Sequence, residues 1–219
     1  MTSQQNSNFD ELEEQIILAR EIGRGIAPPE FPGFRVALSG HRVNLWWQDR
    51  RQRSRDYSDA FISSQNKLVL TTALVSDSLD ATGLALSIRA FLRGCLSGNS
   101  TISQVVTGIE TWSEADPQWS GFCQLGIAVV QSNHSLEFAG FGHVCFALQN
   151  APSQSEEIKV SPTIPLGMGA YVNGMPIETH NHVLQNEQTF KMWIPDCDSV
   201  SEYGTPFPGP IAAVTANGF

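Results

Sequence analysis

A cluster of arginines between residues 42 and 55 is the part of the sequence best suited to chemistry with an anion. Five of the 13 Lys and Arg residues fall here, beside two tryptophans, and they are Arg42, Arg50, Arg51, Arg53 and Arg55. A guanidinium presents a planar fork of donors that matches phosphate oxygens. One interpretation is therefore an anion site, for instance for a phosphate. The other is a solvent-exposed hairpin or edge strand whose arginine stems pack over Trp46 and Trp47.

Acidic and histidine side chains near and beyond this cluster could bind a metal, but each has an ordinary structural interpretation. Asp56 and Asp59 follow the cluster and could be turn residues that pair with Arg53 or Arg55.

Two further groups allow the same pair of interpretations. Asp77 and Asp80 stand where an apolar run gives way to a helical pattern, and an aspartate at such a turn commonly caps the helix. His180 and His182 are one residue apart, which could suggest a transition-metal site. No third ligand lies close in sequence, so we interpret the pair as incidental.

Composition excludes several classes of function. The chain has 219 residues with 13 Lys and Arg against 22 Asp and Glu, a formal net charge of −9, which argues against a nucleic-acid binder. No apolar run approaches the roughly 18 residues that a membrane span needs. The N-terminus lacks the basic and apolar regions of a secretory signal. We therefore expect a cytoplasmic protein with neither a nucleic-acid nor a membrane partner.

Four cysteines are far apart in the chain and form no Cys-x-x-Cys pair: Cys95, Cys123, Cys145 and Cys197. We interpret them as buried thiols in a reducing compartment rather than as disulfides or a zinc site.

The elements that would position all these residues follow an α+β pattern. Residues 1–8 are polar and predicted to be disordered, and helices are expected at 9–24, 81–95 and 101–112. Residues 67–75 form a nearly continuous apolar run, typical of a central strand buried on both faces. Further strands are expected at 34–38, 123–130, 136–139, 142–148, 191–194 and 211–215, with loops at 150–158 and 204–210. Residues 9–219 are thus predicted to be a single domain with helices stacked on sheet.

A series of short motifs runs through this pattern. They are Pro32-Gly33, Ser54-Arg55-Asp56-Tyr57-Ser58-Asp59, Val75-Ser76-Asp77, Arg89-Ala90-Phe91-Leu92-Arg93, Phe141-Gly142-His143, Pro165-Leu166-Gly167 and Thr215-Ala216-Asn217-Gly218. In order and spacing they resemble the metal-dependent protein phosphatases (PPM type), specifically the bacterial SpoIIE/RsbU branch. Their counterparts there include a Gly-Gly-Asp-Tyr-Tyr-Asp motif, an Asp-ended strand, a Pro-Leu-Gly turn and a strand with Thr-Asp-Gly.

The resemblance implies an α-β-β-α sandwich of two antiparallel β-sheets flanked by helices. It also implies two Mn²⁺ or Mg²⁺ ions at one end, which activate a water that attacks a phosphoserine or phosphothreonine. Such ions need hard oxygen ligands and several carboxylates. Asp56 matches the first metal-binding aspartate and Asp77 the one that ends the central strand. His143 matches a residue that shapes a hairpin and is not a ligand.

The remaining ligands implied by the resemblance are missing. The glycines expected after Asp77 are replaced, and Gly83 is the first to follow. No acid stands at 124–126, where the sequence reads Gln-Leu-Gly, and the aspartate of the Thr-Asp-Gly motif is Asn217. The acids Asp196, Asp198 and Glu202 could replace them, although nothing in the sequence places these near Asp77.

Three functions remain open. The first is a degenerate phosphatase, a pseudophosphatase that binds a protein partner in Ser/Thr phosphorylation signalling, with Arg50, Arg53 and Arg55 holding a phosphate and no metal required. The second is an active Mn²⁺- or Mg²⁺-dependent phosphoserine/phosphothreonine hydrolase acting on an anti-anti-sigma-like protein, with Asp59 or Asp80 completing the metal site. The third is an unrelated cytoplasmic α+β protein, which the lack of two face-to-face sheets would reveal.

Overall fold

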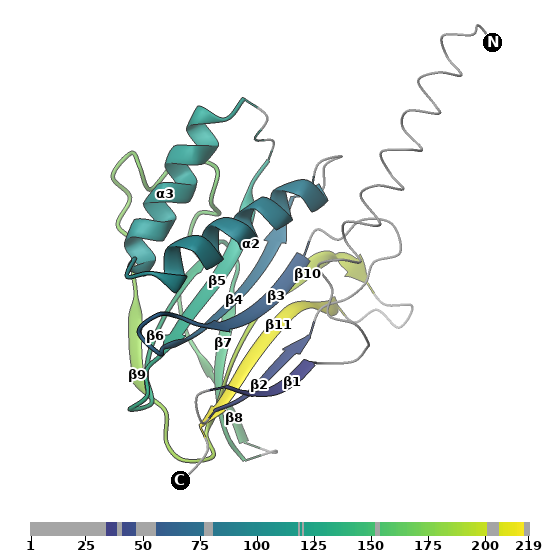
Figure 1. The fold of residues 1–219 in the computed structure, drawn as a ribbon. Coiled ribbons are helices and arrows are strands. Elements are labelled where there is room, and N and C mark those ends of the chain that lie inside the picture. Colours follow the sequence, from purple (N-terminus) through teal and green to yellow (C-terminus); the bar gives the residue numbers. More distant parts are fainter. Residues whose placement is uncertain are drawn as a thin grey trace, which may run out of the picture.

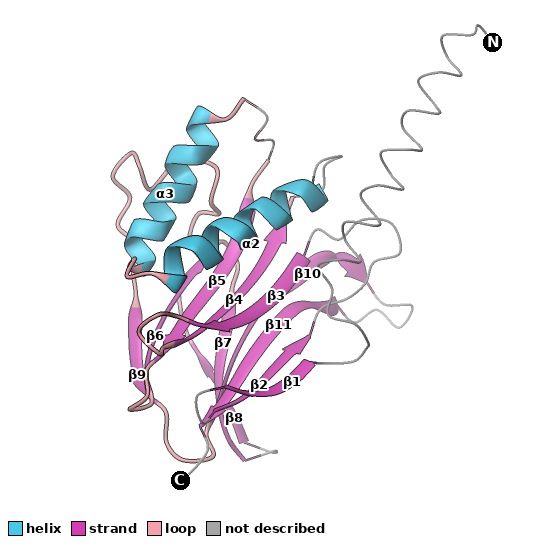
Figure 2. Cartoon of the chain, in the orientation of Figure 1, coloured by secondary structure: helices cyan, strands magenta, loops and turns pink. Residues whose placement is uncertain are grey.

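Two antiparallel β-sheets pack face to face, and two helices cover the outer face of one of them (Figures 1 and 2). The computed structural model describes residues 34–38, 41–46, 56–76, 81–117, 119, 121–151, 154–200 and 206–216. The predicted helix at 9–24 and the predicted disorder at 1–8 lie outside these residues, and the single-domain boundary at residue 9 stays a prediction. The predicted fold class, an α+β sandwich of two antiparallel sheets with flanking helices, is confirmed.

The six strands of the first sheet come from three separate parts of the described chain. In spatial order they are β1 (Phe34–Leu38), β2 (His41–Trp46), β11 (Pro206–Ala216), β10 (Thr189–Val200), β7 (Cys145–Ala151) and β8 (Gln154–Ile158). The second sheet has five strands in the order β3 (Asp56–Ile62), β4 (Leu68–Val75), β5 (Cys123–Val130), β6 (Ser135–Phe141) and β9 (His180–Val183). Helices α2 (Ala81–Ser97) and α3 (Ile102–Ala115) follow β4.

Strand β4 is buried along its whole length, as the sequence predicts. Side chains alternate between the two faces of a strand, and both faces of β4 are covered. Leu68 and Leu70 belong to the core between the sheets, whereas Val69 and Ala73 belong to the core beneath the helices. The central strand therefore separates two hydrophobic cores.

Aromatic side chains fill the core between the sheets. The ring of Phe138 in β6 lies 4.9 Å from that of Phe146 in β7 and 5.1 Å from that of Phe190 in β10, measured between centroids. These three fully buried rings join the second sheet to the first, in the tilted geometry that aromatic pairs prefer.

Helix α3 begins at a reciprocal cap. The Thr101 hydroxyl accepts a hydrogen bond from the Gln104 amide at 3.2 Å, and the Gln104 side chain accepts one from the Thr101 amide at 2.9 Å. This capping box satisfies two amides that the helix itself cannot pair. Among the described residues, no helix is both long enough and apolar enough to cross a bilayer.

The loop predicted at 150–158 is wrong, because residues 154–158 form strand β8, which pairs with β7. Its segment 155–157 is polar and exposed, so it lacks the apolar alternation that marks a strand in sequence. The loop predicted at 204–210 is wrong in the same way, since β11 begins at Pro206. Strands β3 and β9 are not among the predicted strands.

Two other predictions need adjustment. The strand expected at 142–148 begins at Cys145 and crosses to the first sheet, where it pairs with β10. The first part of the arginine-rich stretch lies in β2, which pairs antiparallel with β1 as in a hairpin. It is not an edge strand, because β2 lies between β1 and β11.

Candidate functional site

Asp56 marks one end of the sandwich, at which β3 begins, β4 ends and β5 begins; we call this the near end. Across the sheet Asp56 pairs with Leu74, and Leu74 pairs with Gln124. Leu74 belongs to the core between the sheets, so all three residues of this row face the other sheet. Asp56 is buried, and it is a strand residue rather than the turn residue that one interpretation gave.

Gln124 holds the turn that joins β6 to β7. Its side-chain oxygen accepts a hydrogen bond from the backbone amide of His143 at 3.0 Å. Gly142 in this turn has a φ of +86°, and a Cβ there would come within 2.9 Å of the Gln124 Cγ. The sequence position at which the resemblance expects a carboxylate thus carries a neutral amide whose oxygen is already engaged by the backbone.

Asp59 faces the helices, on the side of β3 opposite to Asp56. Arg93 donates to its two carboxylate oxygens at 2.6 and 2.7 Å, and Arg89 donates to one of them at 3.0 Å. The interpretation that Asp59 is a turn residue paired with Arg53 or Arg55 is therefore wrong.

Burial alone would raise the pKa of Asp59, but the hydrogen bonds from Arg93 and Arg89 outweigh it. The pKa of Asp59 therefore lies below its ordinary value of 3.8. Asp59 is thus an ionised, fully engaged carboxylate that ties α2 to β3, and its two oxygens are directed away from the face that carries Asp56.

The arginine candidates Arg50, Arg53 and Arg55 lie outside the described residues, and so does Asp77. The described strands that precede these residues in the chain, β2 and β4, both end at the near end. Strand β2 ends there at Trp46, which pairs with Ile211, and β4 ends there at Val75, which pairs with Cys123. The assignment of these four residues to a metal or phosphate site stays a prediction.

The motif match at 215–218 is wrong in its placement. Ala216 pairs with His41. The Nε2 atom of His41 lies 3.0 Å from the Nδ1 atom of His134 in the β5–β6 turn. That turn is at the opposite end of the sandwich from Asp56, which we call the far end. Asn217 itself lies outside the described residues.

Strand β10 carries acidic residues toward the near end instead. Trp193 pairs with Cys145, the first residue of β7, and Pro195 pairs with Pro208. Asp196 follows in the same strand. A sequence signal for Asp196 does exist. Phe190, Met192 and Ile194 alternate with other residues as in a strand, and an aspartate follows them closely, as Asp77 follows β4.

The histidine pair lies on β9 at the edge of the second sheet. The ring of His182 is 3.1 Å from the side-chain oxygen of Gln188, and His180 packs 5.3 Å from the ring of Phe138. Within the described parts of the chain, no three His, Cys, Asp or Glu side chains gather as metal ligands would.

The Pro165-Leu166-Gly167 motif is held against the start of β5. Leu166 and Cys123 exchange two backbone hydrogen bonds of 2.9 Å. The fully buried carboxylate of Glu110 in α3 accepts hydrogen bonds from the amides of Gly167 at 2.5 Å and Tyr171 at 3.3 Å. This acid, which sequence reasoning missed, serves the backbone of a loop rather than a metal.

The cysteines whose side chains the structure describes are thiols, as predicted. Cys123 is buried, and burial raises its pKa to about 12, which leaves it protonated at neutral pH. Cys95 and Cys145 are only half-buried, so the prediction of burial holds for Cys123 alone among these three.

No protein-family model matches the chain, and no curated protein matches its sequence. Solved structures do resemble its fold. The RsbU and RsbW domains of Rv1364c from Mycobacterium tuberculosis align with a TM-score of 0.67 at 13% identity, covering 84% of this chain and 62% of that one. The PP2C domain of SiaA from Pseudomonas aeruginosa aligns with a TM-score of 0.61 at 12% identity, covering 100% and 99%. RsbX in complex with magnesium aligns with a TM-score of 0.58 at 9% identity, covering 84% and 98%.

The fold is that of the PP2C, or PPM-type, serine phosphatases. The chain spans only 62% of the length of the Rv1364c structure, which also contains an RsbW domain.

A PPM-type fold implies two divalent cations, and the donors of the described near-end row can be compared with what such a pair needs. Of the row that faces the other sheet, Asp56 alone is an acid, Leu74 offers no donor, and Gln124 has its oxygen engaged by His143. Two divalent charges held close together require several carboxylates. The described row alone therefore supplies fewer carboxylates than such a pair needs.

Proposed function

We propose that the chain is a degenerate PPM-type phosphatase homologue that acts in the cytoplasm as a regulatory or scaffold module. It binds a protein partner in Ser/Thr phosphorylation signalling and does not hydrolyse phosphate. The observation that carries this proposal is the near-end row of Asp56, Leu74 and Gln124, which supplies one carboxylate. Asp59 does not replace the missing charge, because it is engaged by two arginines on the opposite face.

The partner in this proposal is a phosphoprotein, and Arg50, Arg53 and Arg55 hold its phosphate through charge-assisted hydrogen bonds. The support for this role is positional and electrostatic. These arginines connect two strands whose described ends, Trp46 and Asp56, lie at the near end. They also stand out in a chain with a net charge of −9, which disfavours binding of anions elsewhere.

Two assays on the full chain test the proposal together. The first measures release of phosphate from a phosphoserine peptide with millimolar Mn²⁺, beside an active PP2C enzyme as the positive control; we expect no release above the metal-only blank. The second measures binding of the same peptide by the wild type and by a variant with Arg53→Glu and Arg55→Glu. We expect binding that the variant weakens about tenfold or more, since it loses charge-assisted contacts.

Either of two results would contradict this function. Robust Mn²⁺-dependent hydrolysis would show an enzyme. Peptide binding that is unchanged in the double variant would show that the arginine cluster is only a solvated surface. A matched control is the double variant Lys67→Glu and Lys191→Glu, which makes the same change of net charge away from the near end. Lys67 lies in the β3–β4 turn at the far end, and Lys191 pairs with Ala213 of β11.

One observation favours a second function, an active Mn²⁺- or Mg²⁺-dependent phosphatase acting on an anti-anti-sigma-like protein. Strand β10 brings the chain at Asp196 to the same end as Asp56, which adds an acid that the sequence could not place. In that case Asp77→Asn abolishes turnover while the melting temperature changes little. Turnover that survives this substitution would exclude the enzyme as described.

A further inference from the structure

The near end carries an exposed apolar surface that the proposed phosphate site does not use. Four large apolar side chains are exposed in the described part of the chain, and three of them are Phe122, Ile164 and Met168, at 39%, 38% and 61%. Phe122 directly precedes β5, and the other two belong to the loop at residues 163–169. We call these three side chains the apolar ledge. Apolar side chains that gather in one place mark an interaction surface, whereas scattered ones do not.

Backbone hydrogen bonds bring the two segments of the ledge together. Cys123, the residue after Phe122, exchanges two backbone hydrogen bonds of 2.9 Å with Leu166. The ledge residues of the loop lie two positions before and two positions after Leu166. The amide of Phe122 also donates to the hydroxyl of Ser76, which follows β4, at 3.0 Å. The ledge therefore lies beside the end of β4 and the start of β5, at the near end.

Buried groups hold the loop of the ledge in one conformation. The hydroxyl of Tyr171 donates to the carbonyl of Ile164 at 2.7 Å, and the buried Glu110 accepts a hydrogen bond from the amide of Gly167. A Cβ at Gly167 would come within 2.5 Å of the ring nitrogen of Trp119, so the loop packs directly on that ring. A partner would therefore meet an apolar surface that is already ordered, which lowers the entropic cost of binding.

The charge around the ledge is negative. Residues 94–190, which include α3 and both ledge segments, contain one Lys and no Arg. Eight acids fall in the same stretch: Glu110, Glu114, Asp116, Glu137, Glu156, Glu157, Glu178 and Glu187. The exposed Glu114 is next to the ledge, because its carboxylate would lie 2.8 Å from a Cβ at Gly169, the neighbour of Met168. Such a surface attracts a cationic segment and repels a second copy of this chain, whose ledge has the same sign.

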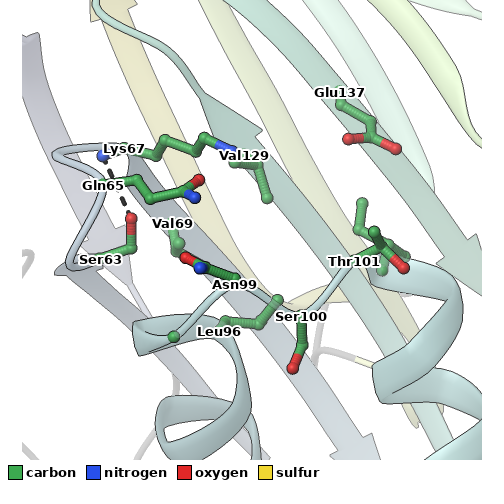
Figure 3. A pocket seen from close by; sticks show the side chains of 12 residues that line it. Ser63, Gln65, Lys67, Val69, Leu96, Asn99, Ser100, Thr101, Val129 and Glu137 are labelled. Carbon is green, nitrogen blue, oxygen red and sulfur yellow. Dashed lines mark hydrogen bonds between the residues drawn. The ribbon is translucent and has the colours of Figure 1, made fainter.

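The hollow at the far end suits a macromolecular partner less well. It lies where the β3–β4 turn and the α2–α3 connection meet (Figure 3). Its cavity volume is about 80 Å³, well below the roughly 300–1,000 Å³ of typical ligand sites. Its lining includes both Lys67 and Glu137 and so has no single sign of charge.

We propose that the apolar ledge binds a segment of the protein partner that is both basic and apolar. Apolar side chains of that segment cover Phe122 and Met168, and a Lys or Arg lies beside Glu114. The ledge site rests on the proposed function only in requiring a protein partner at the near end. It adds a contact that needs no phosphate, and this allows the ledge to be measured apart from the arginine cluster.

The test is fluorescence anisotropy of three short labelled peptides with the full chain. In the first peptide Lys alternates with Leu, in the second Glu replaces each Lys, and in the third Ser replaces each Leu. We expect the first to bind with a dissociation constant below about 1 mM and the other two to bind about tenfold more weakly or less. The second peptide tests the charge of the segment, and the third tests its apolar side chains.

Variants of the ledge should weaken binding of the first peptide. Met168→Ser removes an exposed apolar contact, and we expect a loss of about fivefold. Glu114→Gln removes one charge but keeps the oxygen that accepts from Asn173, and we expect a loss of about threefold. The matched controls are Val183→Ser, at the fourth exposed apolar side chain, and Glu156→Gln, at an exposed acid of β8. Both controls should leave binding unchanged, and all four variants should keep the wild-type melting temperature.

Four results would overturn the proposal. The first is absence of binding of the Lys–Leu peptide up to about 1 mM. The second is equal binding of the basic and acidic peptides, and the third is binding that neither Met168→Ser nor Glu114→Gln alters. The fourth is a dimer in sedimentation experiments that Met168→Ser dissociates, because the ledge would then be an interface between copies of this chain.

Failure of the ledge and failure of the proposed function give different results. If the ledge fails, a phosphoserine peptide still binds and the Arg53→Glu and Arg55→Glu variant still weakens that binding. If the phosphate site fails, the phosphoserine peptide is lost while the Lys–Leu peptide still depends on Met168.

Discussion

Arg93 binds Asp59 through two guanidinium nitrogens, at 2.6 and 2.7 Å, across the interface between helix α2 and strand β3. The same guanidinium lies 5.1 Å from the ring centroid of Phe61, within the range of a cation–π contact. Arg89 adds a third hydrogen bond to the carboxylate. The second aspartate of the Asp-Tyr-Ser-Asp segment is therefore part of the scaffold, and Asp56 alone faces the other sheet.

Asp59→Asn should destabilise the fold. The substitution removes the charge that two guanidinium groups share, and breaking a buried pair commonly costs 3–5 kcal/mol. The side chains of Arg89 and Arg93 are 28% and 45% exposed, so water can partly solvate their unpaired charges. We therefore expect the free energy of unfolding to fall by about 2 kcal/mol. Denaturant unfolding measures it. Glu187→Gln is the control, because Glu187 and Arg42 form an exposed pair whose loss should cost less than about 1 kcal/mol. An equal effect of both substitutions would contradict the structural role of Asp59.

The same carboxylate should make stability depend on acidity. The pKa of Asp59 is lowered in the folded state from its ordinary value of 3.8, so the unfolded chain takes up the proton first as the pH falls. The stabilisation is therefore complete above about pH 5 and is lost as the pH drops through the folded pKa. The difference in unfolding free energy between the wild type and Asp59→Asn should be constant from pH 5 to 7 and should shrink below about pH 4. A difference that grew on acidification would contradict this sign.

Gly126 and Gly83 should respond in opposite directions to alanine. A Cβ at Gly126 would lie 3.0 Å from Thr72, 3.1 Å from Val144 and 3.2 Å from Met192, so the core between the sheets must shift, at a cost of about 1–3 kcal/mol. A Cβ at Gly83 in α2 meets nothing within 4 Å, and alanine there should stabilise the helix by about 0.5–1 kcal/mol. Thermal unfolding of the two variants distinguishes the effects. A stabilised Gly126→Ala would mean that the sheets pack less closely than described.

Glu110→Ala should loosen the loop that carries the Pro165-Leu166-Gly167 motif. It leaves the amides of Gly167 and Tyr171 without their acceptor and creates a cavity, which together should cost about 3 kcal/mol. Hydrogen exchange at these two amides should accelerate more than at the centre of β5. Thr107→Ala, an exposed position on the same helix, is the control and should leave both amides protected. Unchanged protection in Glu110→Ala would exclude this role.

The central part of the fold could be predicted because its signals are local. The apolar run at 67–75 reflects a strand that is buried on both faces. The helical periodicity at 81–95 and 101–112 reflects helices that are buried on one face. Strand β8 escaped prediction because hydrogen bonds to β7 hold it while its polar side chains remain exposed. Edge strands of this kind carry little apolar pattern.

The candidate site was predictable only in part, because its geometry depends on pairings between distant segments. The motifs single out Asp56 and Gln124, and the structure places both in one row of the second sheet, while the metal-binding role of Asp56 stays a prediction. The partners of Asp59 lie 30 and 34 residues away in α2, beyond any local pattern. The motif at 215–218 was misplaced because sequence does not show which end of the sandwich a strand approaches, and the pairing of Ala216 with His41 directs β11 to the far end.

The most direct test of the central claim is calorimetric titration of Mn²⁺ into the chelator-treated full chain, with an active PP2C phosphatase as the positive control and Asp77→Asn as the matched variant. A near-end row with one carboxylate predicts no binding in the micromolar range for either form of this chain, whereas the control enzyme binds. Binding of two ions at micromolar strength that Asp77→Asn abolishes would contradict the degenerate site and establish a metal-dependent phosphatase instead.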